Sequence, residues 1–104
     1  MSYKLQFVQM FKENGRAQFL ALERKFAKLE ETEPGFYKGK RYVSYAGQFP
    51  NNTFIWEREF DTLEEAVLAL KTLKENDSHE ELFAQQNEYF LESYTNIFQS
   101  VCND

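Results

Sequence analysis

The sequence has few of the residues that usually carry special chemistry. It contains one cysteine and one histidine, with two prolines and four glycines, among 104 residues. A lone cysteine, Cys102, excludes an internal disulfide and a cysteine-based zinc site, and it suits a reducing compartment. The chain also has no internal repeat, low-complexity tract or linker. We therefore expect a single domain over residues 1–104, with no metal and no cofactor.

Positive charge and long hydrophobic runs are also scarce. Twelve Lys and Arg stand against 17 Asp and Glu, which gives a net charge of −5. A nucleic-acid binder needs a basic face to displace counterions from phosphates, so this class is excluded. In the first 15 residues, Lys4, Gln6 and Gln9 interrupt the apolar positions. A signal peptide or a membrane span needs an unbroken apolar run, so neither is expected in this segment. The expected location is the cytoplasm.

Aromatic residues are what the chain has in abundance. Eleven Phe, six Tyr and one Trp outnumber the sixteen Leu, Ile and Val residues together. Each ring carries a large apolar area, so the simplest interpretation is an aromatic core. Tyr and Trp also have a polar group, which suits them to pockets and interfaces.

The hydrophobic spacing predicts seven elements in the order βαββααβ. Alternating apolar positions indicate strands, and steps of three and four indicate amphipathic helices. The expected elements are strands at 3–11, about 36–48, 53–60 and 92–101, and helices at 16–33, from 62 onwards, and from 78 onwards.

A short polar link between the second and third strands is typical of an antiparallel hairpin. If the turn is centred near Pro50, Ser44 pairs with Trp56, Tyr42 with Arg58, and Arg41 with Glu59. A register error of one residue would exchange the two faces of the hairpin.

Two capping boxes predict where the later helices begin. One runs from Thr62 to Glu65, and the other from Ser78 to Glu81. The second box makes His79 the first residue of its helix. Such a position is usually exposed, so a surface histidine is expected rather than a catalytic base or a metal ligand.

This element order has a compact solution in the ferredoxin-like α+β fold, a four-stranded antiparallel sheet with helices on one face. Apolar residues occur on both parities of the first strand, including Phe7 on one and Val8 on the other. Because helices cover only one face, the other face would expose apolar side chains. A homodimer through the sheet faces would bury them.

The pattern resembles the dimeric α/β-barrel superfamily, and within it the antibiotic-biosynthesis-monooxygenase-like and NIPSNAP-like proteins. The resemblance rests on Gly15 at the first strand-to-helix corner and on Pro34-Gly35-Phe36 after one long helix. Residues 54–60 leading into the acidic helix start at 61–66 complete it.

The resemblance implies a dimer whose sheets back onto each other, with a pocket between sheet and helices in each subunit. It also implies chemistries such as cofactor-free oxygenation of aromatic compounds, isomerisation or haem degradation. The haem-degrading members have an asparagine at the position of Val8 and an aromatic residue at the position of Phe60. Their histidine lies later in the chain than His79, the only histidine here. Haem degradation is therefore not expected here.

The candidate ligand site surrounds Arg58, which shares one strand parity with three aromatic residues. A guanidinium among rings can stack on them or bind an anionic oxygen of an aromatic ligand, and the alternative is an ion pair with a helix glutamate. The proposed hairpin register adds two hydroxyl groups as neighbours. The expected ligand-binding residues are Tyr42, Ser44, Phe54, Trp56, Arg58 and Phe60.

On the other parity of the same strand, Glu57 and Glu59 fit either an acid–base pair or surface ion pairs. The ion-pair interpretation is preferred, with Arg41 as the partner of Glu59.

Two functions are consistent with these features. The first is a small-molecule-binding dimer, whose enzymatic form would be a cofactor-independent monooxygenase or isomerase acting on a hydrophobic aromatic substrate. The alternative is a non-catalytic protein-association or ligand-sensing module, of which the association module would have no internal pocket. The sequence supplies no convincing catalytic base.

Overall fold

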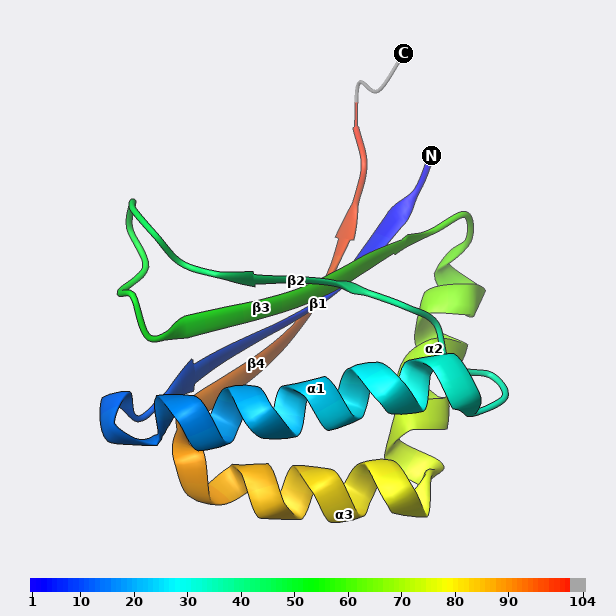
Figure 1. The fold of residues 1–104 in the computed structure, drawn as a ribbon. Helices are drawn as coiled ribbons and strands as arrows, with labels where there is room; N and C mark the ends of the chain where they lie inside the picture. Colours follow the sequence, from blue (N-terminus) through cyan, green and yellow to red (C-terminus); the bar gives the residue numbers. More distant parts are fainter. Residues whose placement is uncertain (102–104) are drawn as a thin grey trace.

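The computed structural model describes residues 1–101, and Cys102 lies outside them. The order of elements is βαββααβ, and the strands form one four-stranded antiparallel sheet in the order β2-β3-β1-β4. All three helices lie on one side of this sheet (Figure 1). The predicted ferredoxin-like α+β fold is therefore confirmed. The strands are β1 (Tyr3–Phe11), β2 (Lys40–Val43), β3 (Thr53–Phe60) and β4 (Phe90–Gln99).

The central strand β1 pairs with β3 on one side and with β4 on the other, and its register assigns side chains to the two faces. Phe7 lies opposite Trp56 and Thr95, whereas Val8 lies opposite Ile55 and Tyr94. Successive side chains of a strand point to opposite faces. The odd positions of β1 therefore face the helices, and its even positions face away from them.

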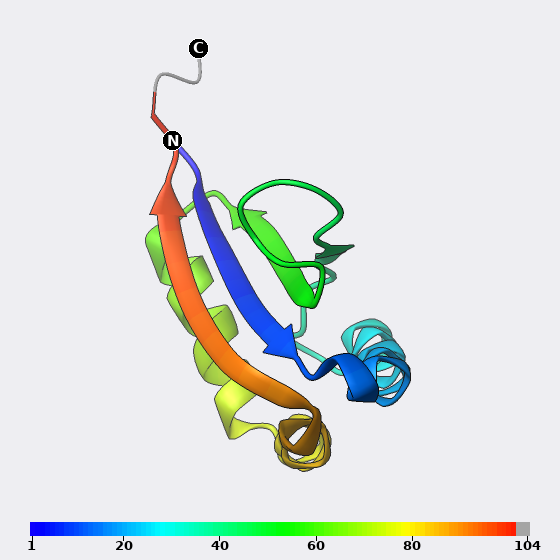
Figure 2. The same ribbon diagram turned by 90° about the vertical axis from the view of Figure 1, so that its left-hand side faces the viewer.

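The three helices meet the sheet in different ways. Helix α2 (Leu63–Glu75) places the small residues Ala66 and Ala69 in the core cluster, which lets it approach the sheet closely. Helix α1 (Arg16–Thr32) is held at one end by Phe19, whose ring stacks on Phe11 and meets the edge of Phe54. Helix α3 (Asp77–Gln86) runs beside α1, and Figure 2 shows this pair nearly end on.

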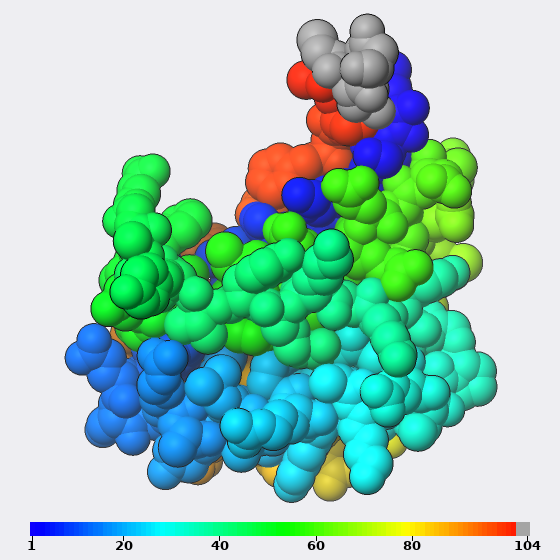
Figure 3. Space-filling view, turned by 45° about the horizontal axis from the view of Figure 1, so that its top comes forward, coloured from blue at the N-terminus to red at the C-terminus, as the bar shows by residue number. Residues whose placement is uncertain are grey.

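The β2–β3 hairpin differs from the prediction. Its loop runs from residue 44 to residue 52, so strand β2 is shorter than expected, and Arg41 pairs with Trp56 instead of Glu59. Tyr42 pairs with Ile55. The register is displaced by three residues, an odd number that exchanges the faces of β2. The long loop stands out from the molecule in Figure 3, and its Tyr45 is 94% exposed.

The first capping box is confirmed and the second is wrong. The Thr62 hydroxyl accepts the Glu65 N–H at 3.2 Å, and α2 begins directly after it. The cap of α3 is Asn76, whose Oδ1 accepts the His79 N–H at 2.9 Å. His79 is consequently the third residue of its helix, one position before Glu80.

The face of the sheet without helices is more polar than the sequence predicted. A row of polar contacts crosses it, in which Gln6 donates to Glu57 at 3.1 Å and Asn96 donates to Gln6 at 3.3 Å. Apolar side chains lie on both sides of this row, with Tyr94 and Phe98 each 50% exposed. Within residues 1–101, no helix is both long enough and apolar enough to cross a bilayer.

Candidate functional site

A cavity of about 440 Å³ lies between the sheet and the helices. Aromatic rings line it from several elements, namely Phe7 and Trp56 from the sheet, Phe26 from α1, Phe83 from α3, and Phe36 from the segment before β2. Its volume falls within the range of about 300–1,000 Å³ that is typical of small-molecule sites.

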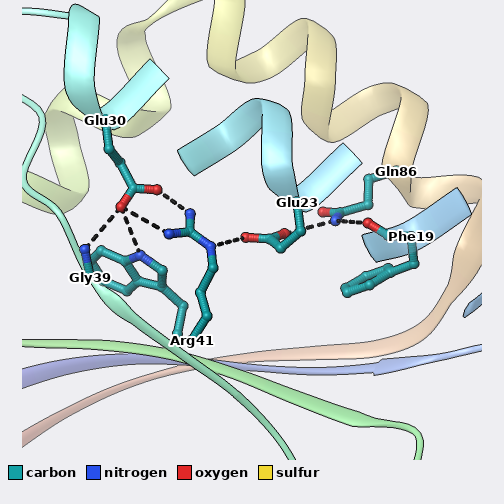
Figure 4. A network of polar contacts seen from close by, with 7 residues as sticks. Phe19, Glu23, Glu30, Gly39, Arg41 and Gln86 are labelled. Carbon is teal, nitrogen blue, oxygen red and sulfur yellow. Dashed lines mark hydrogen bonds and ion pairs between the residues drawn. The ribbon is translucent and has the colours of Figure 1, made fainter. Parts of the chain in front are cut away.

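One wall of the cavity is a polar network centred on Arg41 (Figure 4). The Arg41 Nε donates to Glu23 at 3.0 Å, and both terminal nitrogens of its guanidinium donate to Glu30. Glu30 also accepts the Trp56 indole N–H at 3.2 Å and the Gly39 backbone N–H at 2.9 Å. Each of the three guanidinium nitrogens thus donates to one of two carboxylates of α1.

The network also ties α3 to α1. The Gln86 side-chain amide is 1% exposed and donates to Glu23 Oε2 at 2.8 Å and to the carbonyl of Phe19 at 3.3 Å. Buried polar groups need such partners, because an unpaired one costs free energy. The network therefore links four elements, α1, α3, β2 and β3, around the cavity.

Burial changes the acidity of this network. Burial raises the pKa of Glu23 above its ordinary value, although the hydrogen bond from Gln86 and the charge of Arg41 act in the opposite direction. For Arg41, burial alone would lower the pKa, but Glu30 and Glu23 outweigh it and raise the pKa. Arg41 consequently stays charged, and Glu23 is the easier of the two groups to neutralise.

His79 lies at the cavity wall among aromatic rings. Its ring centroid is 5.0 Å from that of Phe26 and 6.4 Å from that of Phe83, and its side chain is 19% exposed. Desolvation lowers the pKa of His79, and the nearby carboxylates of Glu80 and Glu30 only partly oppose this. The expectation of a surface histidine is therefore wrong, because the helix begins earlier than predicted and turns this residue inward.

The predicted site residues separate into those inside the cavity and those outside it. Phe54 and Trp56 line the cavity and are almost fully buried. Phe60 is buried in the core beyond it, Tyr42 is 48% exposed on the other face of the sheet, and the Ser44 hydroxyl donates to the Phe49 carbonyl. The corrected hairpin register explains why Arg41 lines the cavity in place of Tyr42.

Arg58 shares the helix-facing side of β3 with Trp56 but is not among the residues that line the cavity. Its guanidinium lies 4.9 Å from the ring centroid of Tyr37 and 5.7 Å from that of Phe60, and it donates to the Lys38 carbonyl at 2.8 Å. Of the three rings predicted to surround Arg58, only Phe60 lies beside its guanidinium, and the second neighbouring ring is Tyr37, which the sequence did not suggest. The alternative pairing with a helix glutamate is not found among the described residues.

The two carboxylates on the other parity of β3 make separate surface contacts. Glu57 forms an ion pair with Lys4 at 3.4 Å, and Glu59 accepts a long hydrogen bond from the Ser2 hydroxyl at 3.5 Å. The expected pairing of Glu59 with Arg41 is wrong, because Arg41 points to the opposite face. An ion pair does form here, at Glu57, but its partner lies on β1 and not on the hairpin.

Sequence reasoning missed the polar residues of the cavity, although a signal for two of them exists. Glu23 follows Phe19 by four positions, and Glu30 follows Phe26 by four, so both carboxylates fall on the apolar side of α1. A charged residue on such a stripe needs a buried partner. Within residues 1–101, no three His, Cys, Asp or Glu side chains gather as a metal ion would need.

Comparison with known proteins identifies the fold. No family model and no curated protein matches the sequence. Among solved structures, a NIPSNAP family protein from Agrobacterium tumefaciens is similar with a TM-score of 0.79 and 12% identity, over 99% of this chain and 96% of that one. A NIPSNAP-like domain protein from Burkholderia xenovorans has a TM-score of 0.79 and 13% identity, over 99% and 88% of the two chains.

An antibiotic biosynthesis monooxygenase is also similar, with a TM-score of 0.74 and 16% identity over 95% of this chain and 98% of that one. At such low identities, the likeness concerns the backbone and not the chemistry of the site. The chain has the ferredoxin-like βαββααβ fold of the NIPSNAP and antibiotic biosynthesis monooxygenase structures.

Proposed function

We propose that this protein binds a hydrophobic aromatic small molecule in the cavity between its sheet and its helices. The observation that carries the proposal is the cavity itself, about 440 Å³ in volume, with aromatic rings on several walls and a polar network along one of them. Aromatic walls favour flat, apolar ligands because rings pack well in offset and edge-to-face arrangements. The alternative of a protein-association module without a pocket is disfavoured by the same observation.

The enzymatic form of this proposal is a cofactor-independent monooxygenase or isomerase acting on the bound aromatic molecule. It is supported by the shared fold with an antibiotic biosynthesis monooxygenase, which is an argument from analogy. It is also supported by the presence of His79 in the cavity wall, where an imidazole could act as the general base.

The binding proposal can be tested with N-phenyl-1-naphthylamine, an uncharged fluorescent probe. Ser93 lines the cavity from β4, so Ser93→Phe places a ring in the space that the probe would occupy. Leu91 lies on the same strand, is 62% exposed and does not line the cavity, which makes Leu91→Phe the matched control.

We expect one probe molecule per chain, with at least tenfold weaker binding to Ser93→Phe and unchanged binding to Leu91→Phe. Equal binding to both variants would place the probe elsewhere and contradict the proposal. Absence of binding to the unmodified protein would contradict it as well. Native mass spectrometry of freshly purified protein would add the mass of any ligand that is retained.

A further inference from the structure

One part of the cavity wall differs from the rest because it belongs to no helix or strand. Gly35, Phe36 and Tyr37 line the cavity from the segment that connects α1 with β2 (Figure 1), whereas every other described lining residue lies in a regular element. We call residues 34–39 the strap. Four of its six residues are exposed, and Tyr37 lines the cavity although it is 38% exposed. The strap is therefore a single layer of chain between the cavity and the solvent.

The backbone of the strap makes few hydrogen bonds. The Phe36 N–H donates to the Glu33 carbonyl at 3.3 Å in the turn after α1, and the Gly39 N–H donates to the Glu30 carboxylate at 2.9 Å. The other N–H groups of the strap have no partner among the described residues. Segments with so few backbone hydrogen bonds open at a lower free energy than the helices and strands around them.

Glycines near the two ends of the strap allow it to move. Gly35 has a φ of +82°, a conformation that other residues rarely adopt. Gly39 lies so close to the Trp56 indole that a Cβ atom there would overlap the ring. No side chain can therefore hold this end of the strap in place, and its N–H bond to Glu30 is the polar contact that does so.

The middle of the strap is held by Arg58, which the sequence suggested as a ligand-binding residue. Its guanidinium donates to the Lys38 carbonyl at 2.8 Å and lies 4.9 Å from the ring centroid of Tyr37. The ring of Tyr37 also meets the edge of Phe60 at 5.1 Å. Arg58 has no carboxylate partner among the described residues, and its Nε is buried without a hydrogen bond. The polar contacts of this arginine are thus made with the strap alone.

We propose that the strap is a movable wall of the cavity, which opens to admit the ligand, and that Arg58 is the latch that holds it closed. This inference rests on the proposed function. Arg58 is a positioning residue, because it acts on the cavity through Tyr37 and the backbone of Lys38. The competing entrance is the β4 side, where Ser93 and Thr95 line the cavity and are also exposed.

Amide hydrogen exchange, followed by NMR, tests the movement without any ligand. The Gly39 amide is the reporter, since its bond to Glu30 must break when the strap opens. Its protection factor in the unmodified protein should be at least about a hundredfold lower than those of the amides in the central strand β1. This comparison needs no variant, so it holds even if substitution of Arg58 prevents folding.

The role of the latch is tested with Arg58→Met, which keeps an unbranched apolar chain and removes the guanidinium. Loss of one hydrogen bond from a charged group and one cation–π contact should make the Gly39 amide exchange about tenfold faster. Arg24→Met is the matched control, because Arg24 is exposed on α1 and does not line the cavity. It should leave the exchange of Gly39 unchanged.

Stopped-flow fluorescence with N-phenyl-1-naphthylamine tests the role of the strap in ligand entry. If opening precedes both entry and exit, Arg58→Met should raise the association and dissociation rate constants about tenfold each and change Kd by less than about threefold. Arg24→Met should change neither rate constant.

The outcomes separate this inference from the proposed function. Protection of Gly39 equal to that of β1 would mean that the strap opens only when the whole chain unfolds, and would overturn the inference. Normal binding with unchanged rate constants in Arg58→Met would overturn it as well, since entry would then use the β4 side, and would leave the aromatic site standing. If the probe does not bind at all, the proposed function fails and the role in ligand entry fails with it, whereas the exchange of Gly39 still decides whether the strap moves.

Discussion

At the scale of single residues, Arg41 has the largest structural role in the cavity wall. It is the only cation within hydrogen-bond distance of Glu23 and Glu30 among the described residues, and both carboxylates are nearly buried. Removal of one partner from a buried ion pair leaves uncompensated charge, which typically costs about 3–5 kcal/mol.

We therefore expect Arg41→Met to lower the free energy of unfolding by about 3 kcal/mol or more, as measured by urea denaturation. The control is Lys38→Met, which removes the pair between Lys38 and Glu31, whose side chains are 69% and 60% exposed. This exposed pair should contribute less than about 1 kcal/mol. Similar losses in the two variants would show that burial of the Arg41 network does not determine its contribution.

His79 gives stability a dependence on pH whose sign follows from its environment. Its pKa is lower in the folded chain than the ordinary value of 6.5, so the folded state binds fewer protons than the unfolded state. The contribution of neutral His79 to the free energy of unfolding is fully present above pH 6.5. It declines as the pH falls from 6.5 towards the folded-state pKa. Glu23 has the opposite sign, because its raised pKa favours the folded state as the pH falls through that value.

The effect of His79 is isolated by comparison with His79→Phe, since both proteins retain Glu23. The free energy of unfolding of the unmodified protein should fall relative to that of the variant as the pH is lowered below 6.5. Glu80 and Glu30 are the charged groups that act on the ring, and they are the same in both proteins. If the free energies of unfolding of the two proteins differ by the same amount at pH 8 and at pH 5, folding does not change the pKa of the imidazole.

At the scale of elements, the start of α3 decides whether His79 faces the cavity. Asn76 provides the cap, whereas Ser78, which the sequence also favours, has no capping hydrogen bond in the structure. Asn76→Ala should lower the free energy of unfolding by about 0.5–2 kcal/mol, and Ser78→Ala should change it by less than about 0.5 kcal/mol. Thermal or urea denaturation measures both, and a larger loss for Ser78→Ala would restore the helix start that the capping box predicts.

The elements also show what sequence reasoning can and cannot reach. Strands β1 and β3 were predicted with their observed bounds, because alternating apolar residues in β1 and a run of β-branched and aromatic residues in β3 are local signals. The register of β2 depends on the length of a loop, which no local pattern encodes. Asn76 and Ser78 are both good cap residues, and only tertiary packing decides between them. Because the sequence prediction used Ser78 as the cap, it placed His79 on the exposed side of its helix.

The same reasoning explains the outcome at the candidate site. Phe54 and Trp56 were found because a buried strand face is visible as alternation. Arg41 was missed as a cavity residue because a register displaced by three residues exchanges the faces of β2. Aromatic residues are abundant throughout this chain, so an aromatic side chain alone does not show whether a position lies in the core or at the cavity. The polar residues that line the cavity make that distinction.

At the scale of the whole molecule, the uncovered face of the sheet carries exposed rings on both sides of its polar row. Tyr42, Tyr94 and Phe98 are 48%, 50% and 50% exposed there. Val8 of β1 and Ile55 of β3 lie opposite each other on the same face. Exposed apolar surface of this kind favours association, and two copies related by a two-fold axis would cover it with the same residues. A homodimer through this face therefore remains our prediction.

Sedimentation equilibrium can test this prediction, because the chain mass is 12.4 kDa and a dimer has twice that value. Tyr94→Glu places a charge on the uncovered face and should shift the population to the monomer, since an unpaired charge in an interface costs free energy. Leu68 is 61% exposed on α2, on the helix side, so Leu68→Glu adds the same charge away from that face and should leave the dimer intact. If the unmodified protein is a monomer, or if Leu68→Glu dissociates the dimer and Tyr94→Glu does not, the uncovered face is not the interface. The polar row across this face should then be sufficient to keep it hydrated.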